Sequence, residues 1–211
     1  MPAHARALVK TRVRRRRDDP PGPHRAPPPR PEGILLSVLD VGRGSCAYLE
    51  WPDGRNLMVD CGSLDARDAG ASIAAKYLWW RGGITRLDTL VLTHADADHT
   101  NGARSLIEFM RVRRVVVTRA FDGWPWPAGV EVVTAERRGE PVRLGDVEIL
   151  GPPVWEKFTS SVPPNETSLV LRAGGVLFSG DIEGMGVEEL LALPAPPRIT
   201  GHEGAIEIVI R

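Results

Sequence analysis

The sequence predicts an α+β fold in which two β-sheets pack against each other between outer helices. Short apolar runs of strand length alternate with longer runs of helical spacing from Ile34 onward. These runs form two successive sets, each of strands followed by a helix. The chain of 211 residues is 42% hydrophobic, which is enough for a substantial core and one domain.

The first set predicts a β-meander, then helices around one further strand. Glycine-rich turns at 42–44 and 51–54 separate the first three strands, and Gly82-Gly83 ends the first helix. The predicted strands are 34–39, 46–50, 56–59, 87–92 and 114–117, and the predicted helices are 65–80 and 103–111.

The second set is richer in strands. Its short β-branched and apolar runs are bounded by glycine and proline, as is typical of sheet segments. The predicted strands are 130–134, 142–144, 147–150, 167–171 and 176–179, and one helix is predicted at 187–193.

The charge of the chain is divided unevenly. Residues 1–31 hold nine Lys/Arg, two Asp and eight of the 19 prolines, so they carry +7 and the rest carries −7. We expect residues 1–32 to form a disordered basic tail and residues 33–211 to form the folded domain. An arginine run of this kind can contact nucleic acid or an acidic partner, but a solvated extension or a misassigned start codon is favoured.

The composition favours a cytoplasmic protein. No apolar stretch reaches the roughly 18 residues of a membrane span, and residues 1–31 lack the apolar region of a signal peptide. Cys46 and Cys61 lie in apolar strand-like surroundings and are expected to be buried free thiols.

The segment 93–99 carries the strongest functional signal. It reads Thr-His-Ala-Asp-Ala-Asp-His and follows an apolar strand. Imidazole nitrogens and carboxylate oxygens together suit zinc, manganese or a similar divalent ion. The alternative is a polar turn in which Asp98 or Thr100 caps the helix from Ala103. A cap needs only one such residue, so the metal hypothesis is favoured.

Three further carboxylates follow predicted strands. Asp181 follows the strand 176–179 and is either a metal ligand or the N-cap of the next helix. Asp40 and Asp60 also end strands and are expected to hold ligating groups in place. All three histidines of the body, at positions 94, 99 and 202, occupy candidate ligand positions.

Several ordered segments resemble the metallo-β-lactamase superfamily, with the greatest likeness to the hydrolase domain of ComEC-type competence proteins, which are DNA-uptake channels. The likeness covers about residues 34–203. The segments are 39–44 (LDVGRG, resembling LDVGQG), 52–54 (PDG), 58–62 (MVDCG, resembling IDAG), 92–99 (LTHADADH, resembling LTHxDxDH), 165–171 (NETSLVL, resembling NNxSLVL) and 178–181 (FSGD, resembling FTGD).

The resemblance implies an αββα sandwich with two divalent ions, zinc or manganese, at the edge of the sheets. His94 and Asp96 would hold one ion, and Asp98, His99 and His202 the other, with Asp181 bridging. The supporting residues would be Asp40, Asp60, Asn165 and Ser168. A metal-bound hydroxide would be the nucleophile, and Asp98 would orient it.

The chain departs from the family pattern near its end. Glu203 and Ala205 stand where the family has a second His and a Ser, and the last strand-helix portion is expected to be missing. Such a chain would leave sheet edges uncovered, and dimerisation could cover them.

Three functions follow from these features. The favoured one is a metal-dependent hydrolase of phosphodiester bonds, with DNA or RNA among its potential substrates. The second is hydrolysis of a small ester, thioester or lactam at the same site. The third is a non-catalytic remnant or binding module, supported by the altered segment at 202–205.

Overall fold

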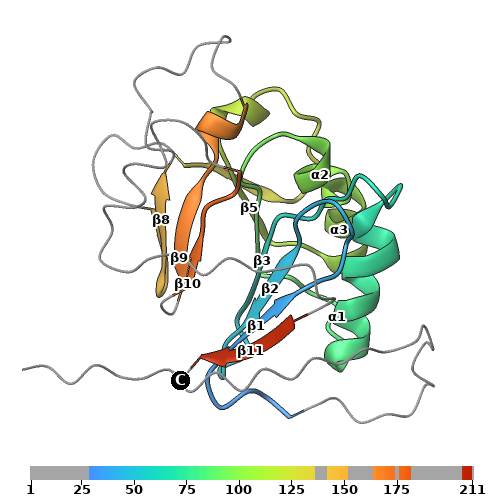
Figure 1. The fold of residues 1–211 in the computed structure, drawn as a ribbon, viewed down its shortest axis with the longest axis vertical. Coiled ribbons are helices and arrows are strands. Elements are labelled where there is room, and N and C mark those ends of the chain that lie inside the picture. Colours follow the sequence, from blue (N-terminus) through green and yellow to red (C-terminus); the bar gives the residue numbers. More distant parts are fainter. Residues whose placement is uncertain (1–28, 136–141, 152–163, 174–175, 182–205, 211) are drawn as a thin grey trace, which may run out of the picture.

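The protein contains two β-sheets that pack face to face, with helices on the outer face of the larger sheet (Figure 1). The computed structural model describes residues 29–135, 142–151, 164–173, 176–181 and 206–210. The predicted α+β sandwich is therefore confirmed in its two sheets and one helical layer. The predicted helix at 187–193 lies outside the described residues.

The larger sheet has seven strands in the order β11-β1-β2-β3-β4-β5-β6. The pairs β11–β1, β1–β2 and β2–β3 are antiparallel. The pairs β3–β4, β4–β5 and β5–β6 are parallel. The strands are β1 (Ile34–Val38), β2 (Ala47–Glu50), β3 (Asn56–Val59), β4 (Thr89–Val91), β5 (Arg114–Val117), β6 (Glu131–Thr134) and β11 (Ile206–Ile210).

The helical layer connects the parallel strands. A π-helical turn η1 (Gly70–Ala74) continues into α1 (Ala75–Gly82), and α2 (Ala97–Thr100) and α3 (Ala103–Met110) follow β4; a short 3₁₀ turn η2 (Arg119–Phe121) follows β5. Helix α1 ends because Gly83 adopts a left-handed conformation (φ 64°), and its N–H caps the carbonyls of Leu78 and Trp79. None of the helices that the structure describes is long and apolar enough to cross a membrane.

The smaller sheet is antiparallel, with the order β10-β9-β8-β7. Its strands are β7 (Val142–Leu144), β8 (Val147–Gly151), β9 (Val170–Ala173) and β10 (Val176–Phe178). A 3₁₀ turn η4 (Pro164–Thr167) precedes β9. This turn occupies the first residue of the predicted strand 167–171, so the strand begins three residues later than predicted.

Two hydrophobic cores lie on opposite faces of the larger sheet. In β4 and the residue after it, Leu90 and Leu92 pack toward the helices, while Val91 packs toward the smaller sheet. This alternation follows from the two-residue period of a strand. Cys46 and Cys61 are buried free thiols of the helix-side core, as predicted.

A candidate metal centre at the carboxyl ends of two strands

The two segments with metal-binding potential lie at one edge of the larger sheet. Asp60 directly follows β3, and Thr93 and His94 follow β4. Because β3 and β4 are parallel neighbours, their carboxyl ends meet at this edge. The N–H of Asp60 donates to the carbonyl of Val91 at 2.8 Å, which fixes the two segments side by side.

Asp60 is the buried centre of a hydrogen-bond network. Its side chain accepts from the N–H of Thr93 at 2.8 Å and from the Thr93 hydroxyl, which lies 2.9 Å from Oδ2. Oδ2 also lies 2.8 Å from Nδ1 of His99. Asp60 adopts a left-handed conformation (φ 57°) that few non-glycine residues tolerate, and aspartate is one of them. This conformation turns the chain at the end of β3.

The network selects which nitrogen each histidine presents. Nδ1 of His99 donates to the Asp60 carboxylate, which accepts only. The Thr93 hydroxyl uses its proton on Asp60, so it accepts from Nδ1 of His94 at 3.1 Å. In its neutral form each imidazole therefore carries its lone pair on Nε2, as metal-ligating histidines commonly do.

The two histidines and Asp181 offer three potential ligand atoms that lie close together. One atom each from His94, His99 and Asp181 lies within 4.8 Å of the other two. Nε2 of His99 is 3.3 Å from Oδ1 of Asp181 and 3.9 Å from Oδ2 of Asp98. Nε2 of His94 is 3.7 Å from Oδ2 of Asp96.

Gly180 brings Asp181 to the site. A Cβ at position 180 would lie 2.9 Å from both Cβ and Oγ1 of Thr93 and 3.0 Å from Cβ of Ser168. Gly180 also has φ 53°, in the left-handed region that favours glycine. Only glycine therefore lets the segment after β10 approach the segment after β4 this closely.

The two imidazoles have different proton affinities. Burial and the neighbouring His99 lower the pKa of His94, although Asp60, Asp181 and Asp96 act in the opposite direction. Burial would also lower the pKa of His99, but the hydrogen bond and charge of Asp60, together with Asp181 and Asp98, raise it above its usual value. His94 is thus held neutral, the form that binds a metal ion.

The site fits a divalent metal ion on the evidence of one atom in particular. Nε2 of His94 is buried and has no hydrogen-bond partner among the residues that the structure describes. An unsatisfied buried nitrogen is costly unless something binds it. Here it faces carboxylates that carry negative charge, so a cation satisfies both the lone pair and the charge.

The sequence profile of the Metallo-beta-lactamase superfamily matches residues 39–211. This chain belongs to that superfamily. The match includes every residue of the candidate centre, from Asp60 to Asp181. Proteins of the metallo-β-lactamase fold generally bind divalent metal ions, and they are typically hydrolases.

The chain is also similar to two curated competence proteins, in agreement with the resemblance found in the sequence. The chain is 26% identical to ComE operon protein 3 of Bacillus subtilis over 81% of its own length and 25% of the relative. It is 28% identical to competence protein ComA of Neisseria gonorrhoeae, over 83% of the chain and 25% of the relative. The chain therefore spans about a quarter of the length of these two relatives.

A third relative is a ribonuclease Z of Bradyrhizobium. It is 32% identical over 44% of this chain and 28% of the relative.

The structure brings most of the predicted ligands of this metallo-β-lactamase domain together. His94, Asp96, Asp98, His99 and Asp181 all lie at the centre, whereas His202 lies outside the described residues. The capping hypothesis is wrong for α3, because its N-cap is Gly102 and no side chain caps it. Asp98 lies instead in the first turn of α2, a helix that the sequence did not predict.

The predicted supporting residues differ in what they contact. Asp60 holds His99 directly. Asp40 accepts a hydrogen bond from Gly42 within its own turn, and the carbonyl of Asn165 accepts from the N–H of Ser168. The hydroxyl of Ser168 is buried beside Gly180, without a hydrogen-bond partner among the described residues.

Sequence reasoning missed the role of Thr93. Its hydroxyl bridges Asp60 and His94 in the buried network. Two signals were available, its position between an apolar strand and a histidine and its place in the segment that resembles LTHxDxDH, but neither indicates a hydrogen bond to Asp60 and His94.

Proposed function

We propose that this protein is a metal-dependent hydrolase that cleaves phosphodiester bonds. The proposal rests on one observation, which is the convergence of two Nε2 lone pairs with the carboxylates of Asp96, Asp98 and Asp181. This is a set of nitrogen and oxygen donors that suits zinc or manganese, and it has enough ligands for two ions.

Divalent ions held there would lower the pKa of a water molecule and offset negative charge on a phosphodiester. His94 and Asp96 would hold one ion, and His99 and Asp98 the other, with Asp181 between them. His202 is proposed as a further ligand from its place in the sequence.

The residues of the chain itself supply orientation and proton transfer. Asp60 fixes the ring of His99, and Thr93 fixes the ring of His94, so neither imidazole must reorganise during the reaction. The side chain of Asp98 is 27% exposed, so its carboxylate is accessible to a water molecule and can accept a proton from it. Hydrolysis then adds water across the phosphorus–oxygen ester bond.

The relatives support a nucleic acid as the substrate. Two of them are competence proteins and one is a ribonuclease Z, whose name gives RNA as its substrate. The same arrangement of donors would also hydrolyse a small ester, thioester or lactam, so substrate choice must be measured.

Metal content and substrate preference test the proposal together. We expect about two ions per chain, measured by mass spectrometry on protein purified without chelators, and loss of metal in the Asp98→Ala, His99→Ala double variant. The wild-type protein should hydrolyse bis-p-nitrophenyl phosphate faster than nitrocefin or a thioester.

A Glu108→Ala variant is the matched control, because Glu108 is an exposed carboxylate on α3 whose ion pair is with Arg104, outside the metal centre. It should keep both metal and activity. Preference for nitrocefin or a thioester would favour the small-substrate hydrolase. Folded protein that binds neither manganese nor zinc would contradict catalysis and indicate a non-catalytic remnant.

A further inference from the structure

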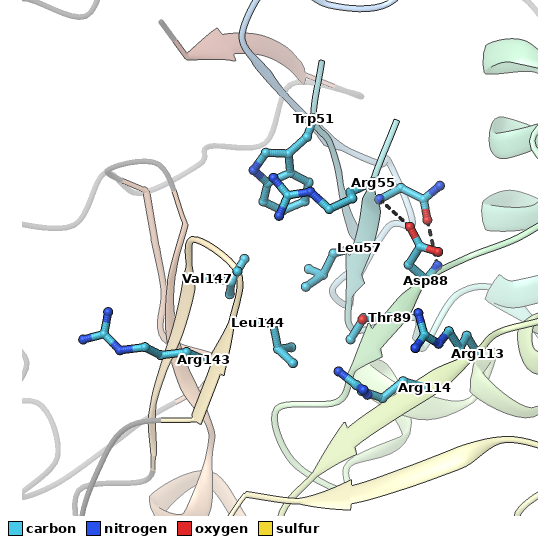
Figure 2. A pocket seen from close by; sticks show the side chains of 12 residues that line it. Trp51, Arg55, Leu57, Asp88, Thr89, Arg113, Arg114, Arg143, Leu144 and Val147 are labelled. Carbon is cyan, nitrogen blue, oxygen red and sulfur yellow. Dashed lines mark hydrogen bonds between the residues drawn. The ribbon is translucent and has the colours of Figure 1, made fainter. Parts of the chain in front are cut away.

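A pocket lies at the opposite end of the parallel strands from the metal centre (Figure 2). It has a volume of about 340 Å³. Its lining includes Asn56, Thr89 and Arg114, which are the first residues of β3, β4 and β5. The turn between β7 and β8, at Gly145, lines the other side. The pocket therefore lies between the two sheets and is separate from the candidate metal centre.

The inner wall of this pocket is apolar. Leu57 and Val147 are almost fully buried, and Leu144 packs against the same core between the sheets. Trp51 closes one end, where its Nε1 donates to Asp146 at 2.5 Å. Figure 2 shows these side chains directed into the space between the strands. Leu144 is the part-exposed member of this wall, so a ligand would contact the wall there.

Four arginines surround this wall, and two of them pair with carboxylates outside the pocket lining. Arg55 pairs with Asp53 at 2.7 Å and with Asp146 at 3.3 Å, and it lies 5.4 Å from the ring of Trp51. Arg114 makes two hydrogen bonds to Glu131, at 3.0 and 3.2 Å. A guanidinium has five N–H donors, so Arg114 has further donors that can bind a ligand.

The other two arginines leave positive charge uncompensated. Arg113 is exposed and has no ion pair with any residue that the structure describes. Arg143 shares a single carboxylate, Glu148, with Arg172. Asp88 is the one carboxylate in the pocket lining, and it accepts from the N–H of Asn56 and lies 3.7 Å from Arg86. Arg113 is therefore the one guanidinium of this lining that pairs with no carboxylate of the described residues.

We propose that this pocket binds a small organic anion. Its phosphate or carboxylate group would lie against Arg113 and Arg114, which are adjacent at the start of β5, and its apolar body would lie on Leu144. A volume of about 340 Å³ is at the lower end of the range for small-molecule sites, which favours a compact ligand over a polymer. The inference does not depend on the proposed metal centre.

The indole N–H of Trp51 gives a local reporter for the test. Its nuclear magnetic resonance signal can be assigned by its loss in a Trp51→Phe variant. Titration of the full chain with phenylphosphonate and with benzoate should shift this signal saturably, while the neutral analogue benzamide should not. The tighter of the two anions identifies the preferred head group. Because the reporter lies in the pocket, binding at the metal centre does not interfere.

Two variants that each remove one positive charge test whether the arginines of the pocket bind the anion. Arg113→Gln should weaken binding of the better anion about tenfold, because it removes charge-assisted hydrogen bonds. Arg104→Gln removes the same charge from α3, where Arg104 pairs with Glu108 outside the pocket, and should leave affinity unchanged. Equal shifts with benzamide, no saturable shift with either anion, or equal effects of the two variants would overturn the proposal.

Discussion

Asp60 combines a backbone role and a site role in one residue. It adopts a left-handed conformation at the end of β3, and its carboxylate holds both Thr93 and His99. The sequence predicted a supporting role for Asp60, because a carboxylate after an apolar strand needs a partner. It could not predict Thr93 as that partner, since the pairing depends on the parallel register of β3 and β4.

Replacing Asp60 with asparagine should separate these two roles. Asparagine tolerates the left-handed conformation, but it lacks the charge that holds His99 and has only one accepting oxygen. We expect metal affinity to fall about 10- to 100-fold, as is usual when a residue supporting a ligand is changed. Competition with a chromophoric chelator would measure this affinity. Unchanged affinity in Asp60→Asn would contradict the assigned role.

At the scale of elements, α2 depends on close backbone contacts rather than on its own sequence. The carbonyl of His99 accepts from the N–H of Cys61 at 2.8 Å, and the carbonyl of Asp98 accepts from the N–H of Ser45 at 3.0 Å. A helix of four residues is too short to show helical periodicity, which is why the sequence did not predict it. Strand β11 was also missed, and its pairing with β1 joins segments far apart in the chain, which a local pattern does not reveal.

Gly62 allows α2 to lie against the segment after β3. A Cβ there would come within 2.4 Å of the backbone N of His99. Gly62→Ala should therefore displace α2, with loss of metal and a lower melting temperature in a thermal scan monitored by circular dichroism.

Gly123→Ala is the control for Gly62→Ala. Gly123 has φ 79° and nothing within 4 Å of its added Cβ, so that variant carries conformational strain of about 1–2 kcal/mol without a clash. It should keep the metal. Metal retention in Gly62→Ala would show that the contact with α2 is not needed.

At the scale of the whole molecule, the larger sheet is shared by two cores. Leu90 is fully buried on the helix side, and Leu171 is fully buried between the sheets. The sequence predicted this sandwich from its runs of strands and helices. The order of strands within the sheets was not predictable, since it is set by contacts between distant segments.

Leu90→Ala and Leu171→Ala should both lower the stability of the same cooperative unit. Each substitution removes a buried leucine and should cost about 2–5 kcal/mol of unfolding free energy. Urea unfolding followed by tryptophan fluorescence and by far-ultraviolet circular dichroism would measure it, with coincident curves for both probes. Two separated transitions would show that the two cores unfold independently.

The alternation along β4 ties the chemistry of this protein to its folding. The side chains of Leu90, Val91 and Leu92 alternate between the two cores, and the same strand ends in Thr93 and His94. If β4 slipped by one residue, Val91 would exchange faces with its neighbours and Thr93 would lose its alignment with Asp60. Mispaired chains would thus lack both the core and the ligands. Correct pairing of β4 therefore forms the core and aligns the candidate ligands in the same step.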